Sequence, residues 1–161
     1  MTNCVTSTTH LNLLKEKGEK AMSYDGGLSI KVVNSELLKI LKDHLKKGTF
    51  DGVDPIPHWI GTKHKRMTTA IDYEYWDCAY INVCPKKLTQ VLECVIKWFD
   101  MFEDDIADRS AYKSFKDELR NNAAKINESY KYVEWIYAHD DGDDCEETFR
   151  FEKGVESYEK E

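Results

Sequence analysis

Residues 28–33 alternate between apolar and polar side chains, with Leu28, Ile30 and Val32 at the apolar positions. Because successive side chains of a strand point to opposite faces, this pattern predicts a strand with one buried face. From residue 35 onward the apolar residues recur every three or four positions, which predicts an amphipathic helix that ends at Gly48. Asn34 or Ser35 is expected to cap the N-terminus of this helix.

Two further helices are predicted in the middle of the chain. Pro85 suits the first turn of a helix, and the residues after it predict a helix over 85–103. The apolar stripe of that helix is Leu88, Val91, Leu92, Val95, Phe99 and Phe102. After an acidic turn, Ser110 is expected to cap a second helix. The buried face of the second helix is expected to hold Ala111, Phe115, Leu119 and Ile126.

β-Branched and aromatic residues indicate the remaining strands. Residues 67–83 are rich in both and are expected to form one or two strands. Residues 130–138 and 145–151 alternate in the same way and are joined by a polar segment, so the pair is predicted to be a β-hairpin. Residues 48–65 hold several glycines and prolines and are expected to be a long loop, a feature that is often functional in a compact domain.

The order of these elements predicts the fold class. We expect an α+β protein with a mostly antiparallel sheet and three to four helices packed on it. A ferredoxin-like core is one arrangement that this order allows. One domain is expected over residues 1–153, with residues 1–23 as a loosely attached N-terminal helix and residues 154–161 as a flexible acidic tail.

The composition limits the class of protein. Charged residues make up 33% of the 161 residues and the formal net charge is −7, while 9 Tyr, 6 Phe and 4 Trp argue against a disordered chain. The net charge is +4 over residues 1–66 and −8 over residues 104–161. This balance disfavours direct binding of nucleic acid and permits a basic protein as partner. No apolar run would span a bilayer and no secretory signal is evident, so a cytoplasmic location away from membranes is expected.

The cysteines do not indicate a disulfide framework or a zinc site. They are widely spaced, odd in number and without a CxxC pair: Cys4, Cys78, Cys84, Cys94 and Cys145. We expect most of them to be reduced thiols that pack as small hydrophobic side chains.

The densest group of charges lies at residues 139–147. Its six carboxylates are Asp140, Asp141, Asp143, Asp144, Glu146 and Glu147. A calcium loop of the EF-hand type needs acids at fixed positions before its glycine, and Tyr137 and His139 stand at the first two of them, so no metal ligand is assigned. Three interpretations stay open: a polar hairpin turn, an acidic surface that contacts a partner, and a weak divalent-metal site. The acidic surface is the hypothesis that we carry forward for partner binding.

A second candidate site is the basic loop 57–66. Its functional side chains would be His58, Trp59, Lys63, His64, Lys65 and Arg66. The cations suit a small anionic ligand such as a nucleotide, and Trp59 would offer a face on which a base stacks. The sequence does not match a known phosphate-binding loop, and the alternative is a solvated loop that a buried Trp59 anchors.

Three functional classes follow from these features. The first is a non-enzymatic protein-binding module, of the inhibitor or immunity type that phages and mobile elements carry, whose acidic and aromatic surface blocks a basic partner. The second is a binder of a small anionic ligand through the basic loop. The third is a metal-assisted hydrolase that uses His58 and His64 with Asp72 or Glu74. We favour the first class, with no catalytic residue, no metal and no cofactor, because no catalytic motif is present.

Overall fold

The computed structural model describes residues 26–64, 67–76, 83–140 and 144–161. Five strands form an antiparallel sheet in the order β4-β1-β5-β6-β7. Their bounds are Gly27–Asn34 (β1), Ile71–Trp76 (β4), Tyr130–Asp140 (β5), Asp144–Glu152 (β6) and Val155–Lys160 (β7). The predicted α+β class is therefore confirmed. The ferredoxin-like core is not shown, since β4 lies directly beside β1 and no strand is inserted between them.

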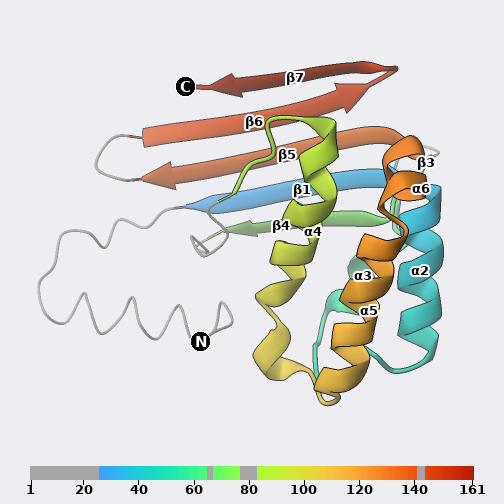
Figure 1. The fold of residues 1–161 in the computed structure, drawn as a ribbon. Helices are drawn as coiled ribbons and strands as arrows, with labels where there is room; N and C mark the ends of the chain where they lie inside the picture. The colour runs from blue at the N-terminus through green and yellow to red at the C-terminus, as the bar shows by residue number, and fades with distance from the viewer. Residues whose placement is uncertain (1–25, 65–66, 77–82, 141–143) are drawn as a thin grey trace, which may run out of the picture.

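The helices form a single layer on one face of the sheet (Figure 1). They are α2 (Ser35–Lys46), α3 (Ile56–Trp59), α4 (Val91–Asp100), α5 (Arg109–Asn121) and α6 (Ala123–Glu128), with the short 3₁₀ turns η2 (Leu88–Gln90) and η3 (Glu103–Asp105). The side of the sheet that these helices cover is called the helix face below, and the opposite side is called the outer face. No described helix covers the outer face.

Strand parity decides which side chains enter the core. The helix face receives Leu28 and Ile30 from β1, Trp135 from β5 and Phe149 from β6. Each of these side chains is at most 2% exposed. The alternation predicted for residues 28–33 is thus confirmed, as is the hairpin of β5 and β6. Most of the strand aromatics serve this core rather than the surface.

Helix α2 begins where the sequence predicts. Asn34 Oδ1 accepts a hydrogen bond of 2.9 Å from the amide of Leu37, which is the geometry of an N-cap. The Nδ2 group of the same residue donates to the carbonyl of Ile126 at 2.7 Å. One buried side chain therefore joins the start of α2 to α6.

The helix predicted over 85–103 is shorter in the structure. The α-helical part starts only at Val91, after η2, and it ends at Asp100. The carboxylate of Glu156 in β7 accepts a 2.8 Å hydrogen bond from the amide of Leu88 at the start of η2. A distant strand thus supplies the acceptor at this helix start, which local sequence does not reveal.

The next helical segment also differs from its prediction. Asp108 rather than Ser110 caps α5, since the Asp108 carboxylate accepts from the amide of Ala111 at 3.0 Å. The expected single helix is two helices, because its regular bonding ends at Asn122, whose side chain donates to the carbonyl of Glu118. Ile126 is buried as expected, but it belongs to α6.

The segment expected to be a long loop is partly structured. It holds α3 and β2 (Lys63–His64), and β2 pairs with β3 (Met67–Thr68). Gly52 has a φ of +95°, and a Cβ atom there would lie 2.1 Å from the carbonyl oxygen of Asp105. Only glycine permits this close packing of the segment against the loop before α5.

The C-terminal segment, which is expected from the sequence to be a flexible tail, forms a strand in the structure. Lys153 and Gly154 both have positive φ and form a two-residue turn, after which β7 pairs with β6 from Val155 to Lys160. The main-chain hydrogen bonds of the ladder hold this strand although nearly all of its residues are exposed. The N-terminal helix expected within residues 1–23 lies outside the described residues.

Candidate functional site

The acidic residues predicted for partner binding lie at one end of the β5–β6 hairpin. Asp140 and Asp144 are the last residues of the ladder and pair with each other through their main chains. Asp141 and Asp143 lie outside the described residues. Glu146 and Glu147 follow in β6, where alternation sends their side chains to opposite faces of the sheet.

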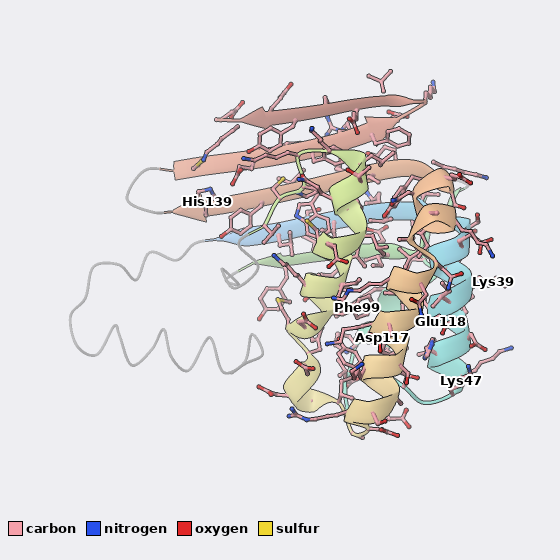
Figure 2. All side chains as sticks on the ribbon, viewed as in Figure 1. Lys39, Lys47, Phe99, Asp117, Glu118 and His139 are labelled. Carbon is pink, nitrogen blue, oxygen red and sulfur yellow. The ribbon has the colours of Figure 1, made fainter. Side chains whose placement is uncertain are left out.

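Glu147 is occupied by internal contacts. It lies on the helix face, where it accepts a short hydrogen bond from the hydroxyl of Tyr158 and stands 3.4 Å from Nε2 of His139. The Glu147 and His139 side chains are only 16% and 14% exposed. His139 lies on β5, close to the hairpin end of the strand (Figure 2). Burial, assisted by the bond to Glu147, raises the pKa of Tyr158. This cluster joins β5, β6 and β7, so Glu147 has a structural role.

Glu146 belongs to a different group, on the outer face. The amide of Glu161 donates to the carbonyl of Glu146 at 2.9 Å, and Glu159 lies opposite Thr148 in the same ladder. We call Glu146, Glu159 and Glu161 the acidic corner. All three are exposed, and none of them makes an ion pair in the described part of the chain.

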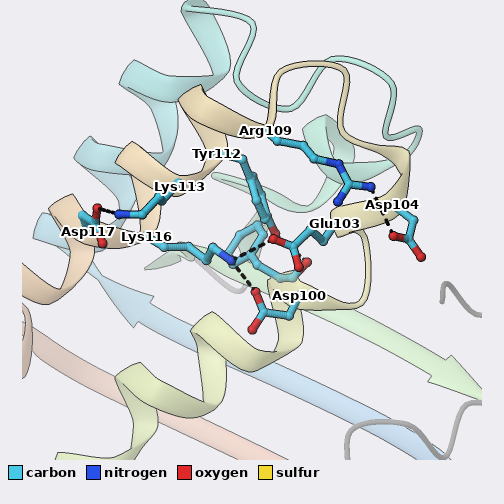
Figure 3. Close-up of polar contacts among 9 residues, drawn as sticks. Asp100, Glu103, Asp104, Arg109, Tyr112, Lys113, Lys116 and Asp117 are labelled. Carbon is cyan, nitrogen blue, oxygen red and sulfur yellow. Dashed lines mark hydrogen bonds and ion pairs between the residues drawn. The ribbon is translucent and has the colours of Figure 1, made fainter. Parts of the chain in front are cut away.

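The acids at the turn between α4 and α5 are arranged differently (Figure 3). The ammonium of Lys116 lies 2.8 Å from Asp100 Oδ1 and 3.3 Å from Glu103 Oε1, and Arg109 contacts Asp104 at 3.4 Å. These carboxylates have cations beside them, so they hold α5 against the preceding turn. The acidic corner lacks such compensation among the described residues.

The basic loop divides into an exposed part and a buried part. His58 is exposed at the end of α3, whereas Trp59 is 7% exposed and packs on Tyr73 with ring centroids 4.0 Å apart. Trp98 and Phe102 contact the same indole. Trp59 therefore anchors the loop in the core, as in the alternative interpretation, and stacking on a base would require it to leave this cluster.

The remaining residues of this site are only partly described. Lys63 and His64 form β2, of which the structure describes the main chain, and Lys65 and Arg66 lie outside the described residues. Asp72 and Glu74, which the hydrolase hypothesis uses, lie on the outer face of β4 opposite Lys31 and Ser29. Within the described ranges, no three His, Cys, Asp or Glu side chains converge as metal ligands would.

A hydroxyl–imidazole–carboxylate chain, of which the hydroxyl and the imidazole are buried, was not expected from the sequence. His44 of α2 lies with Nδ1 2.9 Å from the hydroxyl of Thr49 and with Nε2 2.6 Å from Glu118 Oε2 of α5. Such a chain resembles a nucleophile with its base. However, Thr49 is 2% exposed and His44 is 5% exposed, so a substrate would not reach the hydroxyl. The chain instead joins the end of α2 to α5.

The cysteines described are buried or half-buried thiols without disulfide partners. Desolvation raises the pKa of Cys84 to about 12 and that of Cys94 to about 11. A thiol with such a pKa is protonated at neutral pH and is a poor nucleophile or metal ligand. Both residues line a cavity of about 430 Å³ at the start of α4, together with Lys86 and Lys97.

Comparison with family models, with curated proteins and with solved structures finds no match to this chain. None of the described helices is long and apolar enough to cross a membrane.

Proposed function

We propose that this chain is a non-enzymatic protein-binding module, of the inhibitor or immunity type, whose acidic corner binds a basic surface of a partner protein. The observation that carries the proposal is that Glu146, Glu159 and Glu161 are exposed on one sheet face without a described cation beside them. Like charges held this close repel one another, and cationic side chains of a partner would relieve that repulsion.

The position of the corner favours this role. Glu146 and Glu159 stand on paired strands, and the amide of Glu161 bonds to the carbonyl of Glu146. The main chain therefore fixes the spacing of the corner before binding, and little conformational entropy is lost. The aromatic contribution expected from the sequence has less support, because Trp135 and Tyr137 are at most 2% exposed. Recognition at this site would therefore be mainly electrostatic and would weaken as salt is added.

The alternative function, binding of a small anion at the basic loop, has less support. Its stacking residue, Trp59, is enclosed by other aromatic rings. A nucleotide panel in a thermal-shift assay is the direct test, since a ligand at a hundred times its dissociation constant stabilises a protein by about 2.7 kcal/mol. Stabilisation of that size by a nucleotide would favour the small-anion function over protein binding.

Two measurements test the protein-binding function. The tagged chain is first purified from its native host at moderate salt, and the co-eluting proteins are identified by mass spectrometry. Binding of a synthetic Lys/Arg-rich peptide is then followed by fluorescence anisotropy. The test variant carries Glu146→Gln, Glu159→Gln and Glu161→Gln. The control carries Asp51→Asn, Asp54→Asn and Glu128→Gln, exposed residues whose replacement changes the net charge equally.

We expect the test variant to lose the partner and to bind the peptide at least about tenfold more weakly, and the control to behave as the parent protein. Equal losses of affinity in both variants would show that net charge alone decides binding. That result would contradict a specific role of the acidic corner. A further variant neutralises Asp140, Asp141, Asp143 and Asp144. If only that variant loses binding, the contact surface lies at the hairpin turn instead.

A further inference from the structure

Strand β7 is the last strand of the sheet, so one of its two edges is paired with β6 and the other is not paired with a described strand (Figure 1). In an antiparallel ladder, alternate residues direct their N–H and C=O groups toward the neighbouring strand, and the others direct theirs away from it. The bond from the amide of Glu161 to Glu146 fixes this alternation for the β6–β7 pair. Glu156, Tyr158 and Lys160 therefore direct their main-chain groups away from β6, to the side of β7 where the described part of the chain places no further strand.

The side chains of these three residues form a charge pattern that complements itself. Glu156 and Lys160 stand at equal distances on either side of Tyr158, and all three share the helix face because Tyr158 lies opposite the buried Phe149. When this strand meets a second copy of itself in antiparallel orientation, Tyr158 falls opposite Tyr158. Each Glu156 then falls opposite Lys160 of the other copy.

We propose that the chain forms a symmetric dimer through β7, in which the sheets of two copies continue into one. The three residues that present free main-chain groups are the same three that this register aligns, so up to about six main-chain hydrogen bonds would form across the two-fold axis. Opposite charges directly across an antiparallel pair stabilise it, and an aromatic pair at the centre adds to this.

The outer face of β7 is compatible with the same register. Glu159 falls opposite Ser157, and Glu161 falls opposite Val155, which is the large hydrophobic residue most exposed in the described chain at 69%. No like charges are directly opposed. Natural edge strands often carry charges that prevent pairing with another strand. In β7, Glu156 and Lys160 stand where each would face the opposite charge of a second copy.

Sedimentation velocity over a concentration series tests this proposal, which does not depend on the proposed function. Lys160→Glu would place Glu opposite Glu twice, and Glu156→Lys would place Lys opposite Lys twice. Each variant alone is expected to raise the dimer dissociation constant by about tenfold or more. An equimolar mixture of the two is expected to form a heterodimer, since every opposed pair is then Glu with Lys.

Lys153→Glu is the matched control, because it makes the same charge change in the same hairpin but outside the paired register. It is expected to dimerise as the parent chain does. A parent chain that stays monomeric up to its highest soluble concentration would overturn the proposal. A control that dissociates as Lys160→Glu does, or a mixture that stays monomeric, would overturn it as well.

Hydrogen exchange on the unmodified protein covers the case in which Glu156→Lys fails to fold, since Glu156 also accepts from the amide of Leu88. The amides of Glu156, Tyr158 and Lys160 should exchange more slowly at high protein concentration than at low concentration. The amides of Ser157 and Glu159 point to β6 and should be protected at both concentrations. Exchange at Tyr158 that is independent of concentration would refute the dimer.

Discussion

Lys116 is predicted to make the main polar contribution to the packing of α5 against the turn that precedes it. Its side chain is 14% exposed, its ammonium contacts both Asp100 and Glu103, and it lies 5.0 Å from the ring centroid of Tyr112 (Figure 3). Replacement by Met keeps most of the packed stem and removes the charge. The variant Lys116→Met thus isolates the contribution of the two ion pairs and the cation–π contact.

The expected loss follows from these contacts. Each carboxylate is about two-fifths exposed, so each pair is expected to contribute about 0.5 to 1 kcal/mol, and the cation–π contact about as much again. The sum is about 2 kcal/mol. For a chain of this length, that loss lowers the melting temperature by about 6 °C.

The dependence on pH and salt sharpens this prediction. Burial disfavours the ammonium, but hydrogen bonds to Asp100 and Glu103 outweigh it and raise the pKa of Lys116 above 10.5. The stabilisation by Lys116 is therefore complete below that pH and is lost only as the pH rises further. The difference between parent and variant should be constant between about pH 6 and 9 and should shrink in about 1 M salt.

Lys113→Met is the matched control for this measurement. Lys113 lies on the same helix and pairs with Asp117 at 2.7 Å, but its side chain is 76% exposed. Urea unfolding should show no resolvable loss for this variant, because exposed pairs of this kind contribute little. Equal losses for Lys113→Met and Lys116→Met would refute the argument that burial and the double contact give Lys116 its effect.

Three further outcomes are expected. Gly52→Ala should lower the free energy of unfolding by about 2 to 4 kcal/mol in urea titrations, because its Cβ would meet a main-chain oxygen at 2.1 Å and its φ is +95°. Cys84 and Cys94 should not react with a thiol reagent at pH 8 until the chain unfolds, and their raised pKa values predict a stability that falls as the pH rises above 9.0. Burial opposes the charged form of Glu134, but its hydrogen bonds lower its pKa, so the stability advantage of the parent chain over Glu134→Gln should fall as the pH drops below 4.5.

The elements that the sequence predicts correctly are those whose burial follows a regular period. Strand β1 alternates between core and surface, and α2 carries its leucines on one side and a capping Asn34 at its start. In these cases the local pattern and the tertiary packing agree, so sequence alone suffices. The same reasoning succeeds for the hairpin of β5 and β6.

The errors arise where a distant residue decides the outcome. Strand β7 has no apolar period because it is an edge strand in which every residue except the half-buried Tyr158 is exposed, and its ladder with β6 holds it in place. The start of the helix after Pro85 depends on Glu156, which is 68 residues from Leu88. Ser110 and Asp108 are both capable caps, and only the backbone geometry selects Asp108.

The candidate site was located by sequence only in part. The acidic hairpin was expected, but the assignment of its carboxylates to two faces depends on strand parity, which separates Glu146 from Glu147. Glu159 and Glu161 were missed because they were assigned to a tail. The Lys153-Gly154 pair is a two-residue turn signal directly after β6. It would have predicted a strand from Val155 that folds back along β6, which places Glu159 and Glu161 near Glu146.

The acidic corner and the free edge of β7 have a joint consequence if both proposals hold. A two-fold axis perpendicular to the sheet places both corners on the same outer face, separated by a distance of about 20 Å given the rise per residue of a strand. A basic peptide with two cationic clusters would then bind both corners at once, and by linkage it would favour the dimer. We expect such a peptide to bind the parent chain more tightly than a peptide with a single cluster. Lys160→Glu should remove that difference, as measured by anisotropy, although its added negative charge strengthens binding of both peptides.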